Sequence, residues 1–117
     1  MDYIDPIPPV LNLLKNGLSV RVYGNRFPAK AVVPSVLVRV SGGTDYTRLQ
    51  LIARADTDYE AMIHLLSATN YLSRNAAYIQ GIKVYWIARE SNPTHDFDED
   101  TGKPEAWGYM RLEHLEA

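Results

Sequence analysis

Alternation of apolar and polar residues predicts five β-strands, because successive side chains of a strand point to opposite faces of a sheet. The predicted strands cover residues 18–23, 36–40, 46–55, 82–89 and 106–113. A hairpin at residues 41–45 joins the second strand to the third, and Gly42-Gly43 favours a tight turn there. Residues 24–33 and 91–104 are rich in turn-forming residues, and we expect both to be loops.

Two further segments repeat their apolar residues at the spacing of an amphipathic helix. The first, near 7–16, follows a proline-rich start and ends at Asn16-Gly17, which is typical of a helix stop. The second, near 57–75, opens with Thr57 and has Glu60 three residues later, the pattern of a capping box. The apolar stripe expected to face the sheet consists of Tyr59, Met62, Ile63, Leu66, Thr69 and Asn70, widened by Leu65 and Leu72.

The predicted element order is α-β-β-β-α-β-β, which indicates a single α+β domain over residues 1–117. The strands are connected by short turns or by one helix. This favours a mostly antiparallel sheet of about five strands with both helices packed on one face. A chain of 117 residues is long enough to bury a hydrophobic core without disulfides or metals.

Composition excludes several classes of protein. The chain has no cysteine, so disulfide frameworks, thiolate nucleophiles and cysteine-based zinc sites are ruled out. A net charge of −2 provides no overall positive field to hold nucleic acid. No apolar run approaches the ~18 residues of a membrane span, and the acidic start at 1–5 lacks the basic region of a signal peptide. We therefore expect a soluble intracellular domain.

No residue pattern predicts catalysis, a cofactor or a metal site. The three histidines, His64, His95 and His114, lie in a predicted helix, a loop and the C-terminal region. None has a partner four residues away, as a helical metal pair requires. The sequence also lacks a Gly-x-Ser-x-Gly elbow and a Gly-x-x-x-x-Gly-Lys phosphate loop. We expect a protein that is not an enzyme.

An acidic segment lies in the second predicted loop and contains Asp96, Asp98, Glu99 and Asp100. Alternating aspartates before a glycine resemble a calcium loop. However, the sixth and twelfth positions, where an EF-hand has glycine and glutamate, are Thr101 and Trp107. A solvated hairpin tip explains the charges. The alternative hypothesis is that this acidic loop contacts a basic patch on a neighbouring protein.

Six arginines fall on predicted strands, each opposite the main apolar set of its strand: Arg21, Arg39, Arg48, Arg54, Arg89 and Arg111. Alternation places them on the sheet face away from the helices, together with Tyr23, Leu37, Gln50, Ile52, Tyr85, Ile87, Trp107 and Tyr109. Arginine and large aromatic residues are enriched at protein interfaces, so this face predicts an interface or a channel lining. A solvated sheet face is one alternative, and stacking of nucleic-acid bases is another.

Several segments carry a resemblance to a known family through their order and local patterns. They are the apolar helix with 6–11, the strand 20–23, the loop 26–28, the strand 34–39, the strand 47–53 with the helix start 58–61, and 89–98 followed by 102–104 and a closing strand. Across nearly the whole chain, these segments resemble the tail-terminator proteins of long-tailed bacteriophages, also called tail-completion or minor capsid proteins.

The resemblance implies a structural role without catalysis or a cofactor. Such proteins assemble into a ring, commonly a hexamer, that caps the head-proximal end of the tail tube and stops its polymerisation. The implied partners are further copies of the chain, the tail tube protein and the head-tail connector proteins, and DNA passes through the ring without sequence-specific binding. The implied location is the virion tail, after assembly in the host cytoplasm.

Two alternatives stay open at this point. One is a head-closure or neck adaptor protein, and the other is a small ligand- or nucleic-acid-binding α+β domain. In the terminator interpretation, the candidate interface residues are the six strand arginines, Trp107, Tyr109 and the four acidic residues of 96–100.

Overall fold

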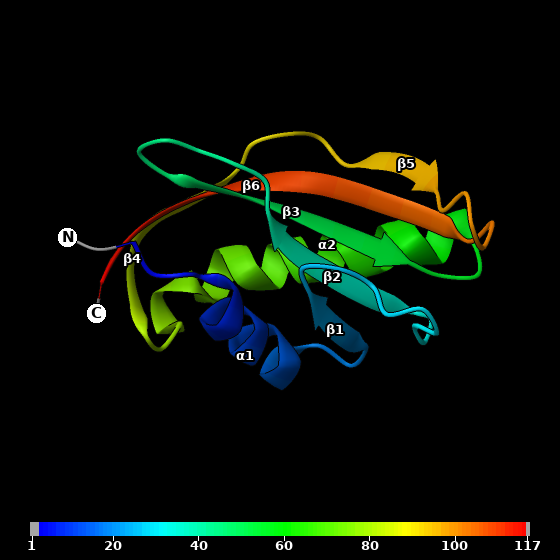
Figure 1. Ribbon diagram of the computed structural model, residues 1–117, viewed down its shortest axis with the longest axis horizontal. Coiled ribbons are helices and arrows are strands. Elements are labelled where there is room, and N and C mark those ends of the chain that lie inside the picture. Colours follow the sequence, from blue (N-terminus) through cyan, green and yellow to red (C-terminus); the bar gives the residue numbers. More distant parts are fainter. Residues whose placement is uncertain (1–2, 117) are drawn as a thin grey trace.

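Six strands form one sheet in the computed structural model, which describes residues 3–116 (Figure 1). The strands are β1 (Arg21–Gly24), β2 (Ser35–Val40), β3 (Thr47–Arg54), β4 (Ile82–Arg89), β5 (Thr94–Phe97) and β6 (Pro104–Glu116). The helices are α1 (Ile7–Gly17) and α2 (Asp58–Asn75), and α2 continues into the 3₁₀ turn η1 (Ala76–Tyr78). The predicted order of two helices and five strands is confirmed, with β5 as an additional short strand. Residues 1–2 of the acidic start and residue 117 lie outside the described part.

The thirteen-residue strand β6 lies inside the sheet, whose order is β1-β2-β3-β6-β4 with β5 also paired to β6. One side of β6 pairs with β3, and the other side is shared by β5 near the start of β6 and β4 near its end. The prediction of a loop over 91–104 was therefore wrong for β5. All pairs are antiparallel except β1 with β2, because residues 25–34 return the chain to the beginning of β1.

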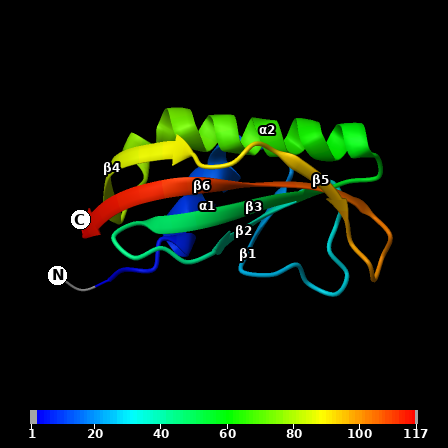
Figure 2. The same cartoon turned by 90° about the horizontal axis from the view of Figure 1, so that it is seen from above.

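Both helices contribute to one buried cluster with one face of the sheet, as predicted. Figure 2 shows α2 lying along this face. Leu51 of β3, Met110 of β6, Leu65 of α2 and Val10 of α1 belong to the cluster and are at most 1% exposed. Burial of each such side chain stabilises the fold by about 1.5–3 kcal/mol. The sheet face away from the helices is called the open face from here on.

The apolar stripe predicted for α2 is wrong in its phase, although Leu65 and Leu72, which were predicted to widen it, are buried. The residues that the helix buries completely are Ala61, Leu65, Ala68 and Leu72. Tyr59, Ile63 and Leu66, by contrast, are 75%, 42% and 36% exposed, and Met62 packs against the core from the side. Two alanines on the buried side let α2 lie close to the sheet. Their small side chains give a weak apolar signal, so the larger side chains dominated the sequence pattern.

Side-chain caps define where both helices begin. The hydroxyl of Thr57 accepts a hydrogen bond of 3.1 Å from the backbone N–H of Glu60, as the capping-box pattern predicts. At α1, a carboxylate oxygen of Asp5 accepts a 3.0 Å bond from the backbone N–H of Ile7. Each cap satisfies a backbone donor that has no partner within its helix.

Two adjacent leucines test the orientation of α2. Leu65→Ala should lower the free energy of unfolding by about 2–5 kcal/mol, because it leaves a cavity in the core. Leu66→Ala should lower it by about 1 kcal/mol or less, because that side chain is partly in water. Chemical denaturation of both variants gives the two values. Equal losses would contradict the orientation described here.

Candidate interaction surface

A β-bulge in β4 changes which side chains this strand presents. Val84 pairs with His114 and Trp86 pairs with Glu113, so Tyr85 is an extra residue between two consecutive partners on β6. Such a bulge leaves one residue unpaired and bends the strand locally. Tyr85 was predicted to lie on the open face by simple alternation, and the bulge removes the basis for that prediction.

After the bulge, the alternation of β4 is reversed. Ile87 pairs with Leu112 and Arg89 pairs with Met110, both of which belong to the helix-covered face. The predictions that Ile87 and Arg89 lie on the open face are therefore wrong. Trp86 takes the open-face position instead, and it is 55% exposed.

One end of the open face is covered by residues 25–34 of the chain itself. Leu37, predicted to lie on this face, is only 4% exposed. The hydroxyl of Tyr23 accepts a 3.2 Å bond from the backbone N–H of Val32, and the ring of Phe27 packs edge-on against Tyr23. The loop over residues 25–34 explains why Leu37 is buried within the single chain, although the sequence suggested that it was an interface residue.

Three arginines gather at the uncovered part of the open face. Arg48 of β3 and Arg111 of β6 are direct cross-strand partners. Arg39 of β2 pairs with Gln50, which places it diagonally next to Arg48. We call Arg39, Arg48 and Arg111 the arginine cluster. Like charges directly opposite each other destabilise a sheet, so this arrangement needs compensation.

Aromatic rings provide part of that compensation. The guanidinium of Arg48 lies 4.7 Å from the ring centre of Tyr109, and that of Arg111 lies 3.8 Å from the ring centre of Tyr46. Cations are attracted to the faces of aromatic rings. Arg111 also has a carboxylate nearby, since its Nε lies 3.6 Å from Oε2 of Glu113. Two like charges are thus held on separate rings.

Hydrogen bonds hold the side chains of Arg39 and Arg48 in the cluster. Nε of Arg39 donates to Oε1 of Gln50 over 2.8 Å, and Nε of Arg48 donates to the carbonyl of Ser41 over 3.1 Å. Among the side chains that the structure describes, neither guanidinium has a carboxylate partner. The terminal nitrogens are therefore oriented donors, and their fork matches a carboxylate or a phosphate.

The aromatic residues predicted for this surface lie beside the cluster. Trp107 and Tyr109 are half-buried on β6, with ring centres 5.3 Å apart in an edge-on arrangement. They form a rigid apolar floor next to the guanidinium groups. Arg21, also predicted here, lies exposed on the edge strand β1, on the far side of β2 from the cluster.

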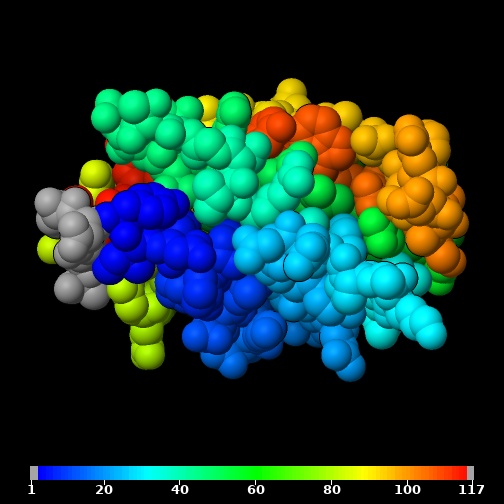
Figure 3. All heavy atoms as spheres, in the orientation of Figure 1, coloured from blue at the N-terminus to red at the C-terminus, as the bar shows by residue number. Residues whose placement is uncertain are grey.

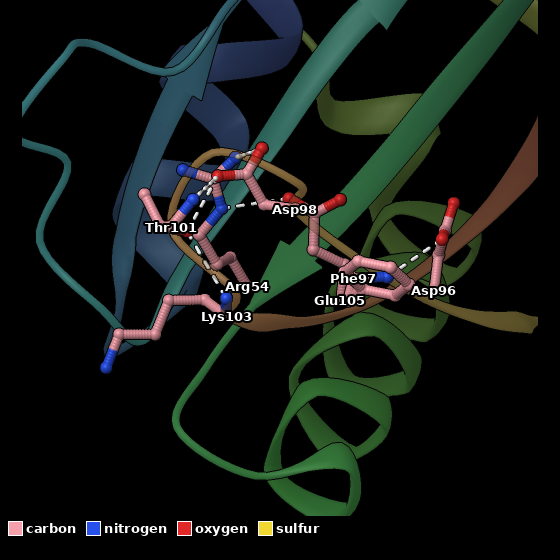
Figure 4. Close-up of polar contacts among 7 residues, drawn as sticks. All are labelled: Arg54, Asp96, Phe97, Asp98, Thr101, Lys103 and Glu105. Carbon is pink, nitrogen blue, oxygen red and sulfur yellow. Dashed lines mark hydrogen bonds and ion pairs between the residues drawn. The ribbon is translucent and has the colours of Figure 1, made fainter.

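Arg54 has a different role from the cluster, although it is on the same face. Its side chain is only 12% exposed. Nε lies 2.8 Å from Oε2 of Glu105, and Nη2 lies 3.5 Å from Oδ1 of Asp98 (Figure 4). The guanidinium also lies 3.9 Å from the ring centre of Phe27. Burial raises the pKa of Glu105, and the hydrogen bond from Arg54 partly offsets this effect. Arg54 is committed to contacts within the chain.

The acidic turn, residues 98–103, is held by one of its own carboxylates. Oδ2 of Asp98 accepts from the backbone N–H of Thr101 over 2.9 Å and from the Thr101 hydroxyl over 2.6 Å. The bond from the hydroxyl lowers the pKa of Asp98 below its ordinary value. Nearby, Nζ of Lys103 lies 2.6 Å from Oδ1 of Asp56. Asp98 thus builds the turn and binds Arg54.

The four predicted acidic residues therefore differ in what they can contact. Asp96 is exposed on β5 and accepts from the backbone N–H of Phe97 over 2.8 Å. Glu99 and Asp100 are exposed at the tip of the acidic turn and make no side-chain hydrogen bond or ion pair with the described residues. Figure 4 shows how Asp98 points inward to Arg54 while the turn projects beyond it.

A cleft of about 330 Å³ separates the acidic turn from the loop after β1. Its lining includes Arg26, Arg39, Arg54, Asp98 and Asp100. Charges of both signs face the space, and the ion pair between Arg54 and Asp98 lies along it. Arg54 therefore links the two loops along this cleft, because it contacts Asp98 of the acidic turn and Phe27 of the loop after β1.

Sequence reasoning missed several residues of this surface. Glu105 was overlooked because the last strand was predicted to begin at residue 106. Extending the alternation by one residue would have placed Glu105 on the same face as Trp107. Phe27 lies in a loop and gave no periodic signal. Tyr46 fell at the start of the strand predicted over 46–55 but was not named for this surface, and it lies just before β3. The contacts of both rings with arginines depend on the tertiary fold.

No protein-family model matches the sequence, and a search of curated proteins found no significant match. Residues 3–116 contain no group of three or more His, Asp or Glu side chains placed to hold a metal ion. Among these residues, no helix is long and apolar enough to cross a membrane.

The pH dependence of stability tests the turn built by Asp98. A lowered carboxylate pKa adds stability above the unfolded pKa, near 3.8, and this stability is lost as the pH falls through the folded pKa. Thr101→Val should therefore lower the thermal midpoint at neutral pH, and the difference from the wild type should narrow in acid. Thermal unfolding across this range measures both.

Thr44→Val is the matched control, because Thr44 is exposed and makes no side-chain hydrogen bond with the described residues. It should change the midpoint little at any pH. A Thr101→Val effect that stays constant below the ordinary pKa of aspartate would show that Asp98 does not gain from the hydroxyl.

Proposed function

We propose that this chain is a structural protein of the phage tail-terminator type. Copies of it join head to tail into a ring at the head-proximal end of the tail tube. The ring stops polymerisation of the tube and forms the joint to the head connector. In this role the chain belongs to the virion tail, and DNA passes through the ring without being read.

The observation that carries the proposal is the separation of two different, oppositely charged patches. The tip with Glu99 and Asp100 lies at one end of a molecule that measures 42 × 24 × 24 Å. Arg48 and Arg111 of the arginine cluster pair with each other at the end of β3 away from Arg54. Beyond them, the hairpin between β2 and β3 projects toward the other end of the molecule (Figure 3). A contact between unlike patches is heterologous, and it closes into a ring when the rotation between subunits allows.

The fold gives the proposal further support. The resemblance to tail terminators was drawn from the predicted order of elements along the chain, and the structure has that predicted order of two helices and five main strands. It also has a sheet with one helix-covered face and one open face. The open face provides the area on which a neighbouring subunit would be placed.

A second candidate function is binding of single-stranded nucleic acid. The specific observation in its favour is that Trp107 and Tyr109 lie beside arginines whose terminal nitrogens are oriented donors. Aromatic rings can stack bases while guanidinium groups hold phosphates. This candidate predicts that the isolated monomer binds DNA and that binding weakens steeply with salt.

The solution mass over a concentration series tests the proposal, together with negative-stain imaging of any large species. We expect either a closed ring with a central hole or a monomer that forms such a ring on purified tail tubes. In both cases tube growth should stop at the capped end. A stable twofold dimer, or tubes that grow unchanged in the presence of the protein, would contradict the proposed function.

A further inference from the structure

We propose that the carboxylates of Glu99 and Asp100 from one copy dock on the arginine cluster of the next copy. This inference rests on the proposed function and names the contact that would join the subunits of the ring. Both surfaces of this contact, the arginine cluster and the tip of the acidic turn, are already ordered in the single chain.

The arginine cluster has the properties of a receptor for carboxylates. Arg48 and Arg111 are opposite each other on neighbouring strands. The rings of Tyr109 and Tyr46 and the carboxylate of Glu113 offset part of their repulsion, and an incoming anion would relieve it further. Hydrogen bonds at Nε hold Arg39 and Arg48 in place, so little side-chain freedom remains to be lost on binding. Their terminal nitrogens are left to pair with an incoming carboxylate.

The acidic turn has the properties of the matching ligand. Asp98, with its two bonds from Thr101, fixes the turn, and its backbone N–H and carbonyl bond to Lys103 and Gly102. Glu99 and Asp100 are thereby presented as two adjacent exposed carboxylates on a fixed backbone. Two nearby carboxylates, by contrast, are occupied by cations: Asp56 pairs with Lys103, and Glu105 with Arg54.

Two of the three arginines of the cluster lie far from the tip of their own chain, whereas Arg39 lines the same cleft as Asp100. The turn is anchored at Arg54, and Arg48 lies six residues earlier on the same strand, β3. At about 3.4 Å per residue, the two arginines are about 20 Å apart. The tip can therefore contact Arg48 and its cross-strand partner Arg111 only on another copy, and that contact is heterologous.

Phosphates of a nucleic acid are the main competing occupant of the arginine cluster. The net charge of −2 disfavours that partner, since the two acidic tip residues would repel a polyanion. Binding of nucleic acid at the cluster is therefore the outcome that would contradict the contact between copies.

Two neutralised variants test the contact directly. The tip variant carries Glu99→Gln and Asp100→Asn, and the cluster variant carries Arg39→Gln and Arg48→Gln. Each variant keeps one functional patch. We expect each alone to self-associate at least tenfold more weakly than the wild type, a loss of about 1.4 kcal/mol or more. Mixed at low salt, they should form a one-to-one heterodimer, because only the intact tip of one and the intact cluster of the other can pair.

Analytical ultracentrifugation of the single variants, the mixture and the wild type measures these outcomes. The matched control is Asp45→Asn with Asp96→Asn, which removes the same charge from two other exposed carboxylates and should leave association within about twofold of the wild type. The tip variant alters only exposed side chains, so it tests the contact even if the cluster variant is less stable.

The results separate this inference from the proposed function. A ring or capped tube that is unaffected by the tip variant would overturn the contact while leaving the ring intact. A heterodimer in the mixture without any ring or capping by the wild type would support the contact and reject the terminator role. The contact would also be overturned if no heterodimer forms in the mixture. The same holds if the wild type and the tip variant bind single-stranded DNA and only the cluster variant has lost this binding.

Discussion

The structure depends on the constraint that two helices cover only one face of a six-stranded sheet. Leu51, Met110 and Leu65 show how that face is sealed, since each is at most 1% exposed. The open face carries charged and aromatic side chains that must be accommodated in another way. Toward one end, the chain covers the face itself with residues 25–34 and the acidic turn, which meet over Arg54. Toward the other end, arginines on tyrosine rings take the place of a covering element.

Much of the fold could be predicted from the sequence, because alternation and helical spacing follow from backbone geometry. The failures have physical causes. The extra residue Tyr85 reverses the alternation of β4, and a bulge has no signature in a simple two-residue pattern. In α2, small residues such as Ala61 form the contact with the sheet, so the largest apolar side chains marked the wrong side of the helix. β5 is short and polar, and it is a strand because β6 offers it an edge.

The sequence predicted which residues share the candidate surface. It did not predict which of them make contacts within the chain and which stay exposed. Arg48 and Arg54 have the same relation to the apolar pattern of β3, and local sequence does not distinguish them. Their surroundings differ because Arg54 meets Glu105 and Asp98, which are distant in sequence. Likewise, Asp98 and Asp100 look alike in the acidic segment. The bonds from Thr101 make the first a structural residue, whereas the second stays exposed.

Charge alone would give a weak joint between subunits, since exposed ion pairs contribute about 0–1 kcal/mol each. Two features of the open face bear on this limit. The guanidinium groups are held before binding, which reduces the entropy lost in each contact. Trp86 lies on the same face opposite Glu113, diagonally next to Arg111, and is 55% exposed. A neighbour seated on the arginine cluster would cover this ring, and buried aromatic area contributes affinity that charges lack. In such a joint the carboxylates set orientation and register, and the tryptophan supplies the apolar contact that holds it.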